Sequence, residues 1–389
     1  MKLLVATDHT FYRTSEGVFD TYCFDRAFFN DYRAVFDEVL VAARMNTTPP
    51  PPGAHRSDGD HVRFIDLANV HGARWALAPA RMYSASLPSA IAKVDAVCVR
   101  LPAVSGVFAA RSARRCGKPL MFEQIGDPRL IGAFGLTGVL FGAYLAFFTR
   151  RIVKQAVTGS YVSQVHLQRA YPPGKGTITD GISSIRLPDA EILPARRFAR
   201  SSDRLEIVLV ASLFRYKDHL TLLRAVGTAA RKGLDFNLDF VGDGPLRARL
   251  ETQVDELNIG GSVNFRGNVA GRAQVNAILD RADLFVMPSL GEGMPRALLE
   301  AMSRGLPTLG ARTPAMEELL PSDQMFPAGD HEALGAMLLR AGRDPSVLSM
   351  WAEHSEVTVR RFSNSVLSAK RKRLLVELRA RAQELQTRA

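Results

Sequence analysis

The chain is poor in the residues that mark disulfide-rich and metal-binding proteins. Its 389 residues include only three cysteines, Cys23, Cys98 and Cys116, and this odd count has no metal-ligand spacing. So few cysteines are typical of a reducing compartment, and we expect the three to be small core residues. The eight histidines show no spacing typical of a metal site, so we expect no metal.

Several catalytic and targeting signals are also absent. There is no Gly-x-x-x-x-Gly-Lys-Ser/Thr loop, which argues against an ATPase, and no Gly-x-Ser-x-Gly elbow, which leaves a hydrolase triad without support. We find no internal repeat. We expect no signal peptide, because Lys2–Ala6 lead directly into Thr7–His9.

Acidic residues are scarce in the first half of the chain. Residues 1–200 hold 25 Lys and Arg against 16 Asp and Glu, whereas the remainder holds 25 against 23. The net charge of +11 therefore belongs mostly to the N-terminal half. This asymmetry predicts an anionic partner there, such as a membrane surface, a lipid phosphate or a nucleic acid. A generally basic proteome is the alternative.

Nucleic acid is the least favoured of these partners. A protein that binds nucleic acid is expected to interleave aromatic residues with its basic ones. The basic helix expected from Ser363 to Ala389 contains Lys370–Arg373 but lacks such aromatics. We therefore expect no nucleic-acid partner.

Apolar runs of strand length alternate with longer segments in both halves. This alternation predicts an α/β fold with two Rossmann-like, doubly wound domains that face a cleft. Strands are expected at residues 2–7, 35–42, 62–67, 94–100 and 120–123 of the first half, and at 205–211, 236–241, 263–265, 284–287 and 306–309 of the second.

An irregular stretch, Leu187–Ser202, separates the two sets of strands. We place the linker there and expect an N-terminal acceptor-binding domain at 1–195 and a C-terminal nucleotide-sugar domain at 196–360. The basic helix at 361–389 is expected to follow, and packing of this helix back on the N-terminal domain is one alternative for it.

The segment Ile131–Thr149 carries no charged residue and is followed by Arg150, Arg151 and Lys154. Its length allows a membrane span. Four glycines and the surrounding α/β pattern argue against one. A helix in the bilayer interface or a hydrophobic lid fits better, and an ordinary buried helix is the other alternative.

Two glutamates mark the candidate site. Glu292 lies in a Ser-Leu-Gly-Glu-Gly loop after the apolar run Asp283–Pro288, and Glu300 lies in a helix expected from Pro295 to about Gly305. A helix N-terminus after a glycine loop favours a phosphate. Glu300, further along the helix, is placed to accept hydrogen bonds from sugar hydroxyls. A nucleoside diphosphate needs this geometry.

Five blocks in order carry a resemblance to a known family. They are Val210–Asp218, Phe240–Pro245, Val263–Val269, Ala282–Ser289 with the glutamate pair, and Gly305–Pro307. Over about residues 205–320 the chain resembles the retaining GT-B glycosyltransferases of family four (group 1 type), and the N-terminal half resembles them in outline. The resemblance implies sugar transfer from a nucleoside diphosphate sugar with retained anomeric configuration and no cofactor.

The resemblance assigns roles in the donor site. Lys217 is expected to neutralise diphosphate charge as the glycosidic bond breaks. Where the family commonly has an arginine, this chain has Ser212, and Arg215 is the expected substitute. Glu300 is assigned to the ribose hydroxyls. Glu292 is assigned to donor-sugar hydroxyls or to the loop itself, because a second carboxylate would repel the diphosphate.

Other residues are expected around the donor. Gly293 and Met294 bring backbone N–H groups close to the sugar or phosphate. Asn268 and Val269 lie in a loop that resembles the family's base-contacting loop, with a simple strand-end turn as the alternative. Gly17 loosely matches the family's early glycine loop near the donor phosphates.

The N-terminal half offers fewer candidates. Asp127 is the carboxylate expected to assist the acceptor or the sugar, with a turn residue as the alternative. His9 follows the first strand, where a lone histidine is more often a turn or packing residue. Asp58-Gly59-Asp60 imitates the metal motif of other glycosyltransferases, but we interpret it as solvated turn residues because its loop is Pro-rich.

The sequence therefore predicts a retaining glycosyltransferase with Asp127, Lys217 and Glu292 as catalytic residues. The basic N-terminal half and Ile131–Thr149 predict a saccharide acceptor at an anionic membrane surface, such as a polyprenyl-diphosphate-linked one used in surface polysaccharide synthesis. We expect a cytoplasmic enzyme, peripheral on the inner membrane face. The alternatives are a GT-B sugar-nucleotide epimerase, which needs acid and base groups of its own, and a phosphorylase, which releases sugar phosphate.

Overall fold

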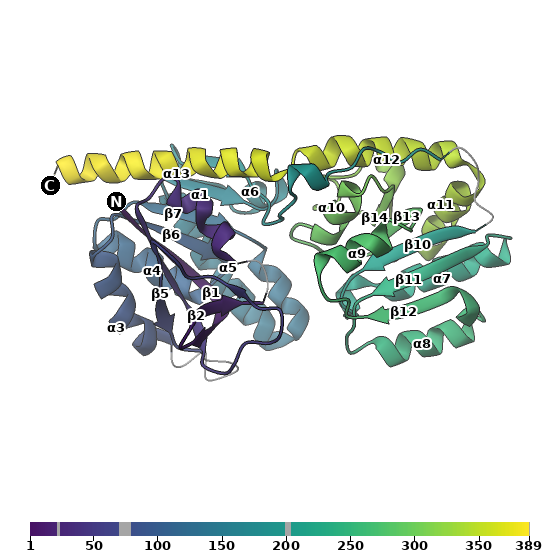
Figure 1. The fold of residues 1–389 in the computed structure, drawn as a ribbon, viewed down its shortest axis with the longest axis horizontal. Coiled ribbons are helices and arrows are strands. Elements are labelled where there is room, and N and C mark those ends of the chain that lie inside the picture. Colours follow the sequence, from purple (N-terminus) through teal and green to yellow (C-terminus); the bar gives the residue numbers. More distant parts are fainter. Residues whose placement is uncertain (22–23, 70–78, 199–203, 389) are drawn as a thin grey trace. The chain divides into compact units, whose positions relative to one another are not determined.

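The computed structural model describes residues 1–21, 24–69, 79–198 and 204–388. The chain divides into two compact units, residues 1–184 with 368–389 and residues 185–367 (Figure 1). The first unit ends at Ser184, before the expected linker, because the stretch after it is held by the second unit: the Leu193 N–H donates to the Ser303 carbonyl at 2.8 Å. Residues 199–202 of the expected linker, like Cys23, lie outside the described residues.

The first unit is built on a mostly parallel sheet. Among the described residues its parallel strands lie in the order β5-β3-β1-β6-β7-β8-β9, and the antiparallel pair β2 and β4 extends from β1. Strands therefore follow one another outward from β1 in both directions, as in a doubly wound fold. Their bounds are β1 Lys2–Thr14, β2 Gly17–Asp20, β3 Glu38–Asn46, β4 His55–Arg56, β5 Val62–Leu67, β6 Ala96–Leu101, β7 Leu120–Gln124, β8 Thr158–Tyr161 and β9 Ile178–Gly181.

Helices connect these strands. Helix α4 begins right after β6, and the long helix α5 follows β7. The Asp8 carboxylate holds the start of α4 by accepting the N–H groups of Val104 at 2.7 Å and Ser105 at 3.0 Å. The helix bounds are α1 Asn30–Arg33, α3 Pro79–Ala92, α4 Val104–Arg115, α5 Leu136–Gln155, α6 His166–Ala170 and α13 Asn364–Thr387.

The second unit carries a fully parallel sheet within the described residues, with the order β12-β11-β10-β13-β14-β15. Counted along the chain, this is the 3-2-1-4-5-6 order of a Rossmann fold. The strands are β10 Leu205–Val210, β11 Phe236–Val241, β12 Val263–Gly267, β13 Leu284–Met287, β14 Thr308–Ala311 and β15 Met325–Phe326; the helices are α7 His219–Arg231, α8 Arg247–Glu256, α9 Arg272–Leu279, α10 Arg296–Ser303, α11 His331–Arg343 and α12 Pro345–Arg360.

The hydrophobic pattern explains this sheet. Its inner strands β10 and β13 are near-continuous apolar runs, as expected when helices cover both faces, whereas β11 and β12 alternate apolar with polar residues. Helix α7 repeats Leu222, Val226 and Ala229 at helical spacing, and these side chains are buried in the core of the unit. The prediction of two doubly wound α/β domains is confirmed. The prediction of core cysteines holds for Cys98 but is wrong for Cys116, which is exposed at the C-terminal end of α4.

Helix α13 is tied to the first unit by buried charges. Arg371 donates to the Asp31 carboxylate at 2.8 Å and lies 3.8 Å from Glu123, and its side chain is only 15% exposed. Glu123 in turn pairs with Arg100 and accepts the Tyr32 hydroxyl at 2.6 Å. Residues from Ser368 onward therefore count with the first unit, although α13 begins in the second.

We expect Arg371→Met to destabilise the first unit by about 3 kcal/mol, because the substitution leaves the largely buried Asp31 carboxylate without its ion-pair partner and removes one of the two guanidinium groups beside Glu123. The measurement is the urea midpoint of unfolding. The matched control is Arg381→Met on the same helix, since Arg381 is 42% exposed and, among the residues that the structure describes, pairs only with Glu384; it should cost less than about 1 kcal/mol. Equal midpoints for the two variants would contradict a stabilising role of the buried Arg371 ion pairs.

Candidate functional site

The candidate site lies at the point where the strand order of the second sheet reverses. β10 and β13 are neighbours, but the chain continues from β10 to β11 on one side and from β13 to β14 on the other. In open α/β sheets ligands bind at this switch point, outside the carboxyl ends of the strands. The loops that leave β10 and β13 contain Lys217 and Glu292.

The two loops are joined directly. The Lys217 Nζ lies 2.6 Å from the Glu292 Oε1, and the two side chains are 15% and 11% exposed. A backbone hydrogen bond of 2.8 Å, from Leu290 N–H to the Tyr216 carbonyl, runs beside this ion pair. An ammonium group has three N–H donors, so Lys217 retains donors for an anion while it holds Glu292.

Local structure places Lys217 at this point. A short 3-10 turn, Arg215–Lys217, ends at Asp218, which has the left-handed backbone (φ 52°) that Asp tolerates better than most residues. The next residue, His219, is buried at the start of α7, and its burial and the nearby Lys217 charge lower its pKa to about 4. His219 is therefore neutral at pH 7 and adds no positive charge beside Lys217.

Helix α10 presents its N-terminus next to Glu292. Pro295 is the N-cap and Arg296 the first helical residue, so the helix starts one residue later than expected. The helix ends with paired hydrogen bonds from Gly305 N–H to Met302 and from Leu306 N–H to Ala301, at 3.0 and 3.3 Å, which is a Schellman motif. Helix dipole and N-terminal N–H groups together favour an anion here.

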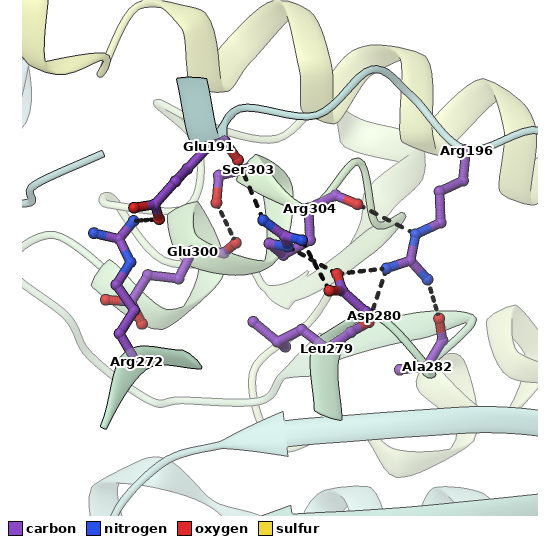
Figure 2. A network of polar contacts seen from close by, with 9 residues as sticks. All are labelled: Glu191, Arg196, Arg272, Leu279, Asp280, Ala282, Glu300, Ser303 and Arg304. Atoms are coloured by element: carbon purple, nitrogen blue, oxygen red, sulfur yellow. Dashed lines mark hydrogen bonds and ion pairs between the residues drawn. The ribbon is translucent and has the colours of Figure 1, made fainter. Parts of the chain in front are cut away.

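Glu300 is a partly buried carboxylate in the middle of α10. Burial raises its pKa, and the charges of Arg296 and Arg272 act in the opposite direction. Figure 2 shows its side chain beside Arg272, which pairs with Glu191 at 2.9 Å and donates to the Arg186 carbonyl at 2.8 Å. Within the described residues the Glu300 carboxylate has no hydrogen bond of its own, and it can accept two hydroxyl groups.

A second set of contacts in Figure 2 fixes the helices around Glu300. Arg196 donates to the carbonyls of Leu279, Ala282 and Arg304, and Arg304 pairs with Asp280 at 2.8 Å. These guanidinium groups cap the C-terminal ends of α9 and α10. Sequence reasoning missed these arginines and Arg272, because their carbonyl and carboxylate partners lie far away along the chain.

Apart from Gly17, the other expected donor contacts lie in the same unit. Asn268 and Val269 follow β12 directly, at the same sheet edge as Lys217, with Asn268 exposed. Met294 is buried and Gly293 half-buried, both in the loop before α10. Arg215 is exposed and has no ion pair among the described residues, so its guanidinium is available to a phosphate.

Asp127 of the first unit is held by its neighbours. Arg129 binds its carboxylate at 2.6 Å, and the Tyr171 hydroxyl donates to it at 2.7 Å. Burial raises the pKa of Asp127, but the hydrogen bonds from Arg129 and Tyr171 outweigh that effect and lower it overall. An ion-paired carboxylate of low pKa is a poor proton acceptor, and the role of Asp127 as a carboxylate that assists the acceptor or the sugar stays a prediction.

Gly17 lies where β1 turns into β2, with φ 148°. A Cβ there would stand 2.7 Å from the Asp58 carboxylate, so the absence of a side chain serves the packing of this hairpin. Asp58 itself pairs with Arg56. His9 is hydrogen-bonded to the buried Asp20 at 2.6 Å, an arrangement that its position in the sequence did not indicate. In the described part of the chain, no group of three His, Cys, Asp or Glu could hold a metal ion.

Comparison with known proteins identifies the class. Residues 195–356 match the family model for glycosyl transferases group 1. The chain is 26% identical over 326 residues to protein CapJ of Staphylococcus aureus, covering 82% of this chain and 81% of CapJ. It is 33% identical over 145 residues to the amylovoran biosynthesis glycosyltransferase AmsK of Erwinia amylovora, which is 35% of each chain.

The fold is shared with solved structures. HepE of Anabaena, crystallised with UDP and glucose, superimposes with a TM-score of 0.65 over 100% of both chains, at 16% identity. The chain is thus a glycosyltransferase with the GT-B fold. Residues 195–356 match glycosyl transferases group 1, so the resemblance to this group that the five sequence blocks carry is confirmed.

Burial of Glu300 leads to a prediction about stability. Folding raises the pKa of the Glu300 carboxyl group above its ordinary value of 4.5. The folded protein therefore loses stability as the pH rises from 4.5 through the raised pKa. We expect the melting temperature of Glu300→Gln to be higher than that of the wild type at neutral pH and equal to it below pH 4.5. Glu353→Gln, on the exposed face of α12, is the control and should change neither value. A Glu300→Gln variant that melts lower at pH 7 would contradict the assignment.

Proposed function

We propose that the chain transfers a sugar from a nucleoside diphosphate sugar to a saccharide acceptor with retention of the anomeric configuration. The observation that carries the proposal is the Lys217–Glu292 ion pair at the switch point, beside the N-terminus of α10. This arrangement offers a cation and helix N–H groups to a diphosphate. Glu300, further along the same helix, suits the ribose hydroxyls.

The chemistry follows from where charge develops. When the bond between the sugar and the diphosphate breaks, the electron pair stays on the diphosphate and the sugar acquires oxocarbenium character. Lys217 and the α10 N-terminus stabilise the growing negative charge, and they do so more strongly in a partly buried site than in water. Glu292, held by Lys217, is placed for the hydroxyl groups of the sugar. The acceptor hydroxyl then forms the new bond to the sugar and gives its proton to the departing diphosphate, which holds the electron pair of the broken bond.

The names and ligands of similar proteins support a nucleotide-sugar donor and a polysaccharide pathway. HepE is crystallised with UDP and glucose, and the name of AmsK refers to amylovoran biosynthesis. We therefore assign this chain to polysaccharide biosynthesis with a nucleotide-sugar donor. Arg215 and Lys217 are the proposed diphosphate contacts of the chain, Asn268 and Val269 the proposed base contacts, and Gly293 and Met294 the proposed backbone contacts.

The acceptor is proposed to be linked to a membrane lipid, on the cytoplasmic face. Helix α5 is long and apolar enough to cross a membrane, but 39% of its most apolar window is buried in the protein. One face packs into the first unit, where Gly142 lies so close to the Pro128 carbonyl that a Cβ would stand 2.6 Å from it. The other face exposes large apolar side chains, among them Leu136, Val139, Leu140, Tyr144 and Phe147. An amphipathic helix of this kind suits the bilayer interface.

The donor site is tested with variants of the second unit. We expect Glu300→Ala to weaken nucleotide binding at least tenfold, since it removes charged hydrogen bonds to hydroxyls. Lys217→Ala should lower kcat about 100-fold or more while the KM for donor changes less, because the charge it neutralises grows in the transition state. The measurements are calorimetric binding of UDP, GDP and ADP, and transfer from a panel of nucleotide sugars.

The control for the donor site is Lys232→Ala, an exposed lysine at the C-terminal end of α7. It should leave binding and turnover unchanged. A wild-type protein that binds none of the three nucleotides and transfers no sugar would overturn the proposed donor class.

Membrane association is tested by flotation with vesicles. We expect Leu136→Ser, Leu140→Ser and Phe147→Ser together to reduce the bound fraction about tenfold or more, because they remove exposed apolar area from α5. The matched control replaces Met350, Val357 and Val376, which are exposed apolar residues of α12 and α13. Equal flotation of the two triple variants would contradict a role of α5 at the interface.

A further inference from the structure

A groove lies on the first unit between α4 and α5. Its volume is about 380 Å³, and its lining joins residues of the two neighbouring helices. The polar lining consists of Arg111 and Arg114 from α4 and of Arg151 and Gln155 from α5. Three guanidinium groups thus line one concave surface.

These three arginines lack the counter-charges that other arginines of the unit have. Arg13, Arg44 and Arg100, for example, each pair with a carboxylate. Within the described residues Arg111, Arg114 and Arg151 form no ion pair, and neither α4 nor α5 contains an Asp or Glu. Like charges gathered without a partner repel one another, so the groove is built to favour an anion.

Guanidinium groups are suited to phosphate. Each presents a planar fork of donors that binds phosphate oxygens two at a time, and it is weakly hydrated compared with an ammonium group. The face of the Phe147 ring lies 4.5 Å from the Arg151 guanidinium carbon and keeps this side chain over the surface of α5. Gln155 adds an amide donor at the same end of the helix.

The remainder of the groove is apolar. Phe108, Tyr144 and Phe148 contribute aromatic rings, and Phe148 packs on Tyr144 with ring centres 4.8 Å apart. Tyr144 also belongs to the exposed apolar face of α5. The basic end of the groove is therefore continuous with a surface that favours hydrocarbon, which is the combination found in a lipid: a phosphate next to apolar chains.

We propose that this groove binds the phosphate group of an anionic membrane lipid and seats the first unit on the bilayer. The inference rests on the proposed membrane association and specifies the headgroup contact. The α5 apolar face would enter the interface while Arg111, Arg114 and Arg151 take the phosphate. The unpaired charges and the adjoining apolar face favour a lipid over a soluble anion, which would gain nothing from the aromatic wall.

The test compares flotation on phosphatidylcholine vesicles with and without phosphatidylglycerol. We expect wild-type protein to bind the anionic vesicles better, and Arg111→Gln with Arg114→Gln and Arg151→Gln to lose about 100-fold in partitioning to them. The matched control is Arg33→Gln with Arg63→Gln and Lys93→Gln, which removes the same charge from exposed positions of the same unit outside the groove. It should lose only a few-fold.

All six positions are exposed, so both triple variants should fold, and thermal unfolding checks this. Arg114→Gln alone should lose several-fold and supports the inference should the triple variant misfold. Equal losses in the groove and control variants would overturn the groove site while leaving membrane association intact. A groove variant that floats normally but loses a thermal shift with inorganic pyrophosphate would assign the groove to a soluble anion instead. Nucleotide binding, measured separately, reports on the donor site alone.

Discussion

The Lys217–Glu292 ion pair joins the two loops that follow β10 and β13. β10 and β13 are neighbours, yet the segments after them lead to strands on opposite sides of this pair. The two connections therefore diverge from the point where the strands end. Parallel strands leave both loops at one edge of the sheet, and the ion pair with the Leu290–Tyr216 hydrogen bond closes the gap between them. The position of the cation, of the glycine loop and of the α10 N-terminus all depend on this closure.

Away from the Lys217–Glu292 ion pair, charge pairing distinguishes side chains that hold the fold from side chains that are open to a ligand. Arg371 and Glu123 are buried and matched by partners of opposite charge from other elements, so they hold these elements in place. Glu300 and the arginines of the α4–α5 groove lack such partners among the described residues. Burying the Glu300 carboxylate without a partner costs free energy, and the like charges gathered at the groove repel one another. A protein tolerates such costs where a ligand supplies the missing group.

Local patterns allowed much of the fold to be predicted. The strands at 62–67, 236–241 and 284–287 match to the residue. Apolar residues are continuous in 284–287 and are interrupted only by single polar residues in the other two. β8 and β9 were missed, since Thr-Gly-Ser-Tyr and Ile-Thr-Asp-Gly carry no strand-like apolar pattern, and only their place in the sheet makes them strands. The site loops were found for a similar reason: strand, glycine loop and helix follow one another without interruption.

The sequence by itself determined the class of protein, the two doubly wound domains and the positions of Lys217, Glu292 and Glu300, because each depends on neighbours along the chain. Only the tertiary structure decided which charges are matched. It joined Lys217 to Glu292 across 75 positions, engaged Asp127 with Tyr171, and gathered arginines of α4 and α5 on one groove. Such pairs follow from strand order and helix packing, which bring distant residues together and which no local pattern encodes.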